Sequence, residues 1–400
     1  MSGTRRKPGW MGPHIAGFRE SLFAIGYTPG TVRGLLMVMG QLGRWMEIAD
    51  VGPERLTVDD LDAFGRWLRT RPDRRVPRLR SGDPLIVYLR DVGVLDAPKP
   101  LPATPVSEVL AVYRSWLSGE RGLAPPTVLR YENTARRFLE ERFGVAGDRF
   151  IVDLVAADVT GFLVAECGRV SLGAAKGRVA ELRSLLRFLF LKGWTRRPLG
   201  IAIPPVAGWH DTTIPMGIAA GDVERLIASC DRSTAIGARD VAVLLLVARL
   251  GLRSAEVARL ELDDIDWRAG ELVVRGKARR QDRLPLPHDV GDALSTYLTG
   301  VRPAASDRRV FLTAKAPIQP LRPDRVSDIT RRACARVGIA EVGAHRLRHA
   351  LAAELLRRGA TLVEVSQVLR HRDLATTAVY AKVDLDTLRQ VAQPWPGARP

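Results

Sequence analysis

The sequence predicts a mainly α-helical protein that carries one small antiparallel β-hairpin. Amphipathic helical patterns recur along its 400 residues. Alternating periodicity occurs at Glu271–Lys277 and Asp282–Pro287, which predicts two strands joined by a basic turn. Proline-rich breaks at residues 96–105 and 198–216 indicate linkers, because such stretches favour extended backbone. These breaks divide the chain into three predicted domains, residues 1–97, 106–200 and 212–390.

The first two of these domains resemble each other. GYTPGTV at residues 26–32 matches GLAPPTV at residues 122–128, and YLRDVG at residues 88–93 matches FLFLKG at residues 188–193. The likeness predicts a duplicated bundle of about four helices, each copy with one basic face and a proline in the first turn of an early helix. A chance likeness between amphipathic helices is the alternative.

The third domain is predicted to contain the hairpin and most of the remaining helices. Its longest apolar run, Val241–Ala248, predicts a buried helix and is too short to span a bilayer. The stretch at residues 344–380 predicts three short helices. Thr361 and Glu364 have the spacing of a capping box that begins the second one, with Val363, Val368 and Leu369 on its apolar side.

The charge of the chain favours a polyanionic partner. Lysine and arginine number 61 against 44 acidic residues, a net charge of +17, and only seven of the basic residues are lysine. The excess is +5 in residues 1–100, +5 in residues 101–205 and +7 in the rest, so it is not a basic tail. A long polyanion contacted by every domain explains this distribution. A general preference for arginine explains the shortage of lysine but not the net excess.

The remaining composition favours a cytoplasmic protein without a membrane partner. Its three cysteines, Cys167, Cys230 and Cys334, lie far apart and have no metal-binding spacing. The N-terminus MSGTRRKPGW lacks the apolar core of a signal peptide. No cofactor or metal is expected.

Single residues in the third domain are weak evidence for a site. His345 and Arg348 share a helix face, but about 0.8 such H-x-x-R patterns are expected by chance in this composition. Tyr380 alone fits helix packing, and Lys277 alone fits a solvated turn. His349 is assigned to helix packing.

The joint pattern is more informative, because it resembles the tyrosine recombinase (phage integrase) family, including its Xer-like members. Four segments resemble the boxes of that family: GLRSAEVARLELDDID, VVRGKARRQDRLPLP, HRLRHALAAELL and LRHRDLATTAVYAKVD. They supply, in the family's order, six candidate catalytic residues: Arg253, Lys277, His345, Arg348, His371 and Tyr380. The resemblance is specific over residues 220–385 and looser over residues 106–200. Arg370 departs from the pattern, because the family usually has glycine there; arginine would take that place at some strain or add a phosphate contact.

The resemblance implies a fold and a reaction. Residues 106–200 would form a SAM-like core-binding domain, residues 212–390 the tyrosine recombinase catalytic domain, and residues 1–97 an added helical domain. Tyr380 would attack the phosphorus and become covalently linked to DNA. Arg253 and Arg348 would bind the phosphate oxygens, while Lys277 would protonate the leaving 5′ oxygen. His345 and His371 would transfer protons or donate hydrogen bonds, and Glu256 would brace the arginines.

The predicted function is that of an integrase or transposase of a mobile element. Its expected partners are double-stranded DNA with inverted-repeat sites, further copies as a dimer on a site and a tetramer in synapsis, and possible partner recombinases. In the family the segment after the tyrosine, here Ala381–Val391, often docks onto a neighbouring subunit.

Three alternative functions are compatible with parts of the sequence. A non-catalytic DNA-binding regulator would lack some of the six residues, all of which are present. A type IB topoisomerase would use the same chemistry on any DNA. A metal-dependent nuclease could use the carboxylates of residues 261–266, but their crowding into one turn favours turn formation and pairing with arginines.

Overall fold

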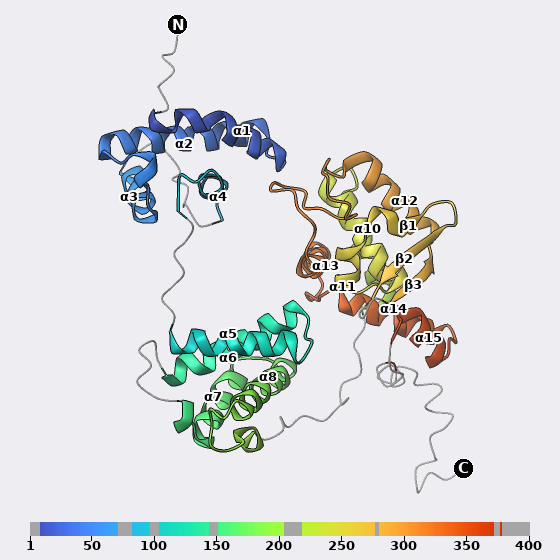
Figure 1. The fold of residues 1–400 in the computed structure, drawn as a ribbon. Helices are drawn as coiled ribbons and strands as arrows, with labels where there is room; N and C mark the ends of the chain where they lie inside the picture. Colours follow the sequence, from blue (N-terminus) through green and yellow to red (C-terminus); the bar gives the residue numbers. More distant parts are fainter. Residues whose placement is uncertain are drawn as a thin grey trace, which may run out of the picture. The chain divides into compact units, whose positions relative to one another are not determined.

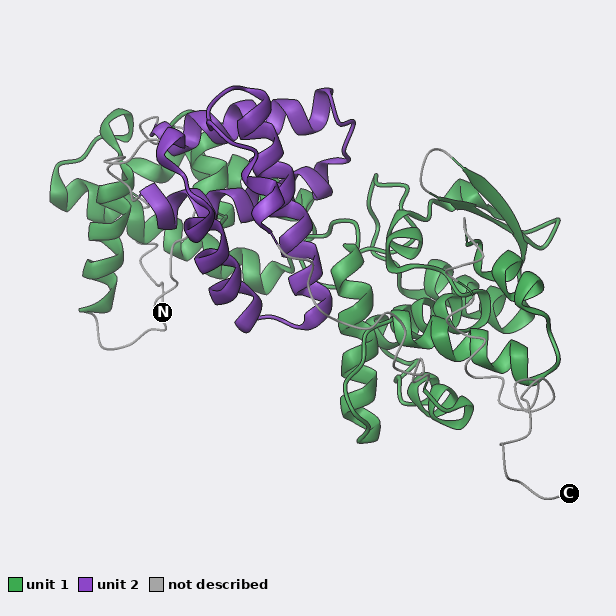
Figure 2. Cartoon of the chain, turned by 90° about the horizontal axis from the view of Figure 1, so that it is seen from below, with its two compact units in different colours: residues 1–97, 211–400 green, residues 98–210 purple. Residues whose placement is uncertain are grey.

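The structure is a computed structural model that describes residues 9–70, 82–96, 104–143, 151–203, 218–276, 280–371 and Thr377. It divides into two compact units, one formed by residues 1–97 with 211–400 and the other by residues 98–210 (Figure 2). Both are mainly helical, and the sheet has three short antiparallel strands, as the sequence predicts for the fold class. Across the described ranges no helix is both long and apolar enough to cross a membrane.

Residues 9–70 and 82–96 fold into a helical bundle that has its own hydrophobic core. Thr28 begins its longest helix, because the Thr28 side chain accepts a hydrogen bond from the backbone N–H of Thr31 and Pro29 follows in the first turn. Phe18, Met39 and Phe64 are fully buried between the helices. The α-helices are α1 (Ile15–Ala24), α2 (Pro29–Ala49), α3 (Val58–Arg69) and α4 (Pro84–Asp91).

Unit 2 has the same number of α-helices around a separate core. Thr104 and Ser107 cap the first helix reciprocally, and Pro125 opens the second, as the sequence predicts. Tyr113 and Phe188 pack with ring centroids 5.0 Å apart. The helices are α5 (Pro105–Gly119), α6 (Pro125–Phe143), α7 (Ala156–Gly168) and α8 (Leu172–Leu191). Duplication of the two bundles and the division into three domains remain predictions.

The described residues between 218 and 371 are built around one buried helix, α10 (Ala235–Leu250) (Figure 1). Every residue from Val241 to Ala248 is buried, which confirms the predicted buried helix. Its neighbours are α9 (Ala220–Ala228), α11 (Ser254–Arg259), α12 (His288–Thr296), the π-helical turn Tyr297–Val301 and α13 (Pro323–Val337).

The predicted hairpin is present and gains a third strand. Strands β2 (Glu271–Arg275) and β3 (Gln281–Pro285) pair in antiparallel fashion, with Val273 opposite Arg283. The two-residue strand β1 (Ile265–Asp266) pairs with the outer edge of β2 and was not predicted. Leu272 and Val274 of β2 are buried, because alternate residues of a strand point to one face.

The C-terminal described stretch contains α14 (His345–Arg357) and α15 (Leu362–Leu369). Thr361 and Glu364 form the predicted capping box at the start of α15. The predicted apolar side of α15 is wrong in part, because Val363 is 52% exposed and Val368 39% exposed. Leu369 is buried as predicted, and Val365 is buried in place of the two valines, on the face that packs against α14. The predicted third helix, which carries Tyr380, lies outside the described residues.

Candidate active site

The turn after α10 brings Arg253 to the site. Gly251 ends α10 with φ +58°, a left-handed conformation that glycine adopts without strain. A Cβ atom on Gly251 would lie 2.7 Å from Cδ2 of Leu369, so the close approach of α15 also favours glycine. Two residues later Arg253 stands at the N-cap of α11, with its side chain 42% exposed.

Glu256 holds Arg253 in place. Its carboxylate accepts hydrogen bonds from the Arg253 backbone N–H at 2.9 Å and from Nη1 of Arg253 at 2.6 Å. Burial alone would raise the pKa of Glu256, but these donors and the nearby Arg370 guanidinium outweigh it and keep that pKa below its ordinary value. Glu256 is therefore a charged brace at neutral pH, which is the role the sequence predicts for it.

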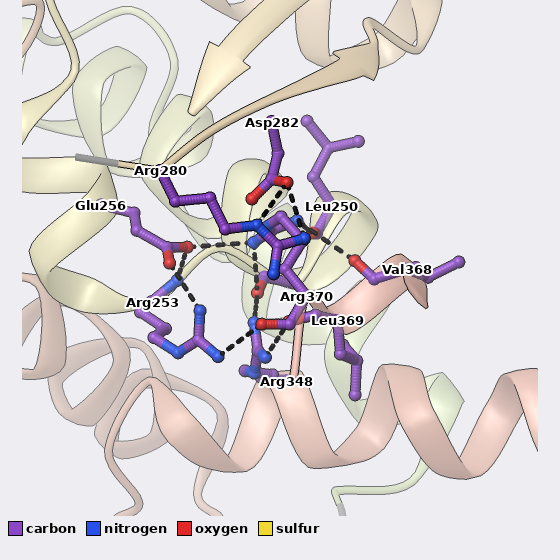
Figure 3. A network of polar contacts seen from close by, with 10 residues as sticks. Leu250, Arg253, Glu256, Arg280, Asp282, Arg348, Val368, Leu369 and Arg370 are labelled. Atoms are coloured by element: carbon purple, nitrogen blue, oxygen red, sulfur yellow. Dashed lines mark hydrogen bonds and ion pairs between the residues drawn. The ribbon is translucent and has the colours of Figure 1, made fainter. Parts of the chain in front are cut away.

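Arg348 links α14 to the ends of two other helices. Its side chain is almost fully buried, and it donates to the backbone carbonyls of Gly251 and Leu369 (Figure 3). The C-terminal carbonyls of a helix lack intrahelical partners, so a guanidinium there satisfies them and offsets the negative end of the helix dipole. Arg348 therefore fixes α10, α14 and α15 around one point.

Arg370 occupies the position after α15 with a left-handed backbone, φ +55°. For a residue with a Cβ atom this conformation costs on the order of 1–2 kcal/mol. Its side chain is only 3% exposed and forms an ion pair with Glu256 at 3.0 Å. The sequence predicts backbone strain or a phosphate contact for Arg370. The strain is confirmed, and the side chain points inward to Glu256 in this structure (Figure 3).

Three histidines lie beside these arginines. The rings of His345 and His349 meet edge to face with centroids 4.2 Å apart. His371 follows Arg370 directly, and its Nδ1 lies 2.7 Å from the hydroxyl of Thr377, an interaction that orients the ring.

Burial first, and then the neighbouring charges, lower the pKa values of the three histidines. Burial, with the charges of Arg348 and Arg253, lowers the pKa of His345. Burial and the same two arginines lower the pKa of His371 to about 4. Burial, then the neighbouring His345, lowers the pKa of His349 to about 4. All three rings are therefore neutral at pH 7 in the free protein, where each can donate one N–H and accept one proton.

The structure brings four of the six predicted residues together. Arg253, His345, Arg348 and His371 come from α10–α11, α14 and the end of α15, and each lies within electrostatic reach of the others. Lys277 follows β2, and Tyr380 follows Thr377; both lie outside the described residues. Sequence reasoning missed two contributions, the Thr377 hydroxyl on His371 and the Arg370 side chain on Glu256.

The carboxylates of the acidic turn at residues 261–266 are paired with arginines or accept hydrogen bonds from backbone N–H groups. Asp264 pairs with Arg275 at 2.8 Å, and Asp263 pairs with Arg308. Asp266 accepts from two backbone N–H groups of its own turn. These carboxylates therefore act as turn formers and arginine partners, as the sequence predicts.

Comparison with known proteins defines the class. Residues 218–386 match the model of the phage integrase family. The chain is 40% identical to the integrase/recombinase y4rA of Sinorhizobium fredii, over 98% of this chain and 97% of that protein. The chain therefore belongs to the phage integrase family, the tyrosine recombinases, and is a site-specific recombinase.

More distant relatives share the fold. XerD of Mycobacterium tuberculosis is 31% identical, over 72% of this chain and 96% of that protein. The structure of XerH bound to palindromic difH substrate covers 98% of both chains with a TM-score of 0.54 at 16% identity. A lambda integrase dimer bound to a COC′ core site covers 73% of this chain and 99% of that chain, with a TM-score of 0.53 at 15% identity.

Proposed function

We propose that this recombinase cuts and rejoins DNA through a covalent 3′-phosphotyrosine on Tyr380, without a metal ion or ATP. The observation that carries the proposal is the convergence of Arg253, Arg348, His345 and His371 on one point. Glu256 pairs with both Arg253 and Arg370, and Arg348 is held by backbone carbonyls instead, so these three arginines with one glutamate leave a net positive charge to receive a phosphate.

The reaction conserves the energy of the broken bond. Tyr380 gives its phenolic proton to a neutral histidine as its oxygen attacks the phosphorus, a P–O bond to tyrosine forms, and the P–O bond to the 5′ oxygen breaks. The leaving oxygen takes its proton from Lys277. Attack by a free 5′ hydroxyl on the phosphotyrosine reverses these steps and releases Tyr380, so rejoining needs no nucleotide.

The side chains around the proposed phosphate position stabilise the transition state. Arg253 and Arg348 hold the non-bridging oxygens, and fixed donors of this kind contribute about 10²–10³ in rate each. His345 and His371, neutral before DNA binds, accept or donate a proton at the same phosphate, which contributes roughly 10²–10⁴. Glu256 keeps Arg253 oriented before the DNA arrives.

Unit 2 is proposed to bind the DNA backbone through a set of arginines that we call the arginine array: Arg114, Arg130, Arg136, Arg137, Arg169 and Arg178. Three buried carboxylates anchor them, because Glu132, Glu166 and Glu181 each pair with two or three of these guanidiniums. Glu140 also pairs with Arg136 at 3.7 Å, so six positive charges face four carboxylates and still leave an excess. Most of the array is 41–73% exposed. Tethered guanidiniums lose little side-chain entropy when they bind phosphates.

The biological setting is proposed as follows. The enzyme acts in the cytoplasm as the integrase or transposase of a mobile element, as a dimer on inverted-repeat sites and a tetramer in synapsis. A transposon integrase, that of Tn1549 in complex with circular intermediate DNA, is among the proteins of similar fold (TM-score 0.53, 14% identity), which supports this setting.

A nicked suicide duplex tests the chemistry. Its sequence is obtained by selecting bound fragments from a randomised duplex library with the full-length protein. We expect a covalent protein–DNA adduct that forms in EDTA without ATP, is lost in Tyr380→Phe and persists in the matched control Tyr27→Phe.

Two results would change the proposal. If selected DNA is bound but no Tyr380-dependent adduct forms, the chain is a non-catalytic regulator. If the adduct forms and any supercoiled plasmid is relaxed without site preference, the activity is that of a type IB topoisomerase.

A further inference from the structure

Arg370 is one of two residues other than glycine that have a positive φ in the described part of the chain; the other is Asp50. The position ends α15 and immediately precedes His371. Glycine would take this backbone conformation without strain, so a compensating interaction of the side chain should account for the arginine.

The side chain of Arg370 is inserted between the end of α10 and the start of α11. Nη1 donates to the carbonyl of Leu250 at 3.2 Å and to that of Val368 at 3.1 Å. Nη2 donates to the carbonyl of Gly251 at 3.3 Å and to Oε2 of Glu256 at 3.0 Å. Arg370 thus satisfies helix-end carbonyls and neutralises a buried carboxylate at the same time (Figure 3).

Arg253 is held by Arg370 in two ways. Both guanidiniums share the carboxylate of Glu256, Arg253 through Oε1 at 2.6 Å and Arg370 through Oε2. The backbone carbonyl of Arg370 also accepts a hydrogen bond from Nη2 of Arg253 at 3.2 Å. The direction of the Arg253 guanidinium therefore depends on both the side chain and the backbone of Arg370.

We propose that Arg370 is a positioning residue for Arg253: through Glu256 and its own carbonyl it sets the orientation of the arginine that receives the scissile phosphate, and it adds to the positive charge around that arginine. The inference rests on the proposed function, because Arg253 is a phosphate ligand only in that mechanism. Without the Arg370 side chain, Glu256 pairs with Arg253 alone and the cluster of three arginines and one glutamate loses one of its two excess positive charges.

The test compares Arg370→Gly, which suits the backbone, with Arg370→Lys, which keeps the charge but not the fork of donors. Arg358→Gly is the matched control, because Arg358 is also the C-cap of a helix but is 76% exposed and pairs with Glu354. Non-covalent binding to the selected duplex and single-turnover adduct formation on its nicked form are measured for each. We expect Arg370→Gly to bind DNA within a few-fold of wild type and to cleave about 100-fold more slowly. Arg370→Lys should cleave at a rate between those of Arg370→Gly and wild type, and Arg358→Gly should cleave at the wild-type rate.

A double-mutant cycle separates positioning from a merely structural role. Because Arg370 acts through Glu256, Arg370→Gly combined with Glu256→Gln should cleave at about the rate of the slower single variant, without a further loss. The double variant also removes both buried charges, so it should fold even if Arg370→Gly does not. A methylphosphonate at the scissile position replaces a charged non-bridging oxygen by a neutral methyl group. The charge that Arg253 would stabilise is then absent, so the loss of cleavage rate in Arg370→Gly should shrink to about 10-fold or less.

The outcomes distinguish this inference from the proposed function. If wild type forms no adduct, the proposed function fails. If wild type forms it and Arg370→Gly, or the double variant, cleaves at the rate of Arg358→Gly, the inference is overturned. Losses that simply add in the double variant, or that stay unchanged with methylphosphonate, also overturn it.

Discussion

The arginine array of unit 2 makes a quantitative prediction about salt dependence. We choose Arg130, Arg136 and Arg137 of α6, whose side chains are 41–60% exposed, and replace all three by glutamine. Each phosphate contact releases counterions and contributes about 0.9 to the slope of log K against log salt. If each of the three contacts one phosphate, the triple variant should lower the magnitude of the slope by about 2.7.

The fold of unit 2 should tolerate this change. Glu132 keeps its pair with Arg114 at 2.6 Å and Glu181 keeps Arg178 at 3.0 Å. Glu166 keeps Arg169 and Arg178 at 3.8 and 3.9 Å. No buried glutamate is left unpaired, which is the situation that would destabilise the helices most.

Fluorescence anisotropy of the selected duplex, titrated with the full-length protein at several NaCl concentrations, measures the slope. Between 50 and 200 mM salt the affinity of the triple variant should fall about 40-fold less than that of wild type. Arg187→Gln is the matched control: Arg187 is exposed and lies nine residues, about 2.5 turns, after Arg178, on the other side of α8. A triple variant whose slope equals that of Arg187→Gln would refute the assignment of the array to DNA.

Two further predictions concern stability. Gly251→Ala should lower the free energy of unfolding by about 2–4 kcal/mol, because left-handed strain of about 1 kcal/mol adds to about 1–3 kcal/mol for a methyl placed 2.7 Å from Leu369 Cδ2. Gly270→Ala, with φ +65° and open space around it, should lower it by only about 1 kcal/mol. Urea denaturation measures both losses, and equal losses would contradict the packing argument. The pKa values of His349 and His371 lie near 4, below their ordinary 6.5, so the unfolded chain binds more protons between those values. Thermal stability should therefore fall as pH drops from 6.5 towards 4, and a midpoint that stays constant or rises over that window would contradict these pKa values.

Much of the site could be predicted because its residues lie in short motifs with local spacing. Thr361 and Glu364 cap α15 from within one turn, and the alternation in β2 and β3 is visible in the sequence itself. Glu256 could be assigned as a brace because it follows Arg253 by one helical turn.

Other features depend on contacts that no local pattern records. Arg370 and Glu256 are 114 positions apart, and only the packing of α15 against the end of α10 makes them partners. The apolar side of α15 was wrong in part because valine occurs on both of its faces, and α14 decides which face is covered. β1 has only two residues, too few for a periodicity to be visible.

The ion pair between Arg370 and Glu256 also bears on how such enzymes can diverge. A chain that exchanges Arg370 for glycine gains an unstrained helix end but leaves a buried carboxylate with one partner fewer. A chain that exchanges Glu256 first leaves two guanidiniums facing each other without a counter-charge. A paired exchange avoids both of these unpaired charges, so substitutions at positions 256 and 370 are expected to be coupled.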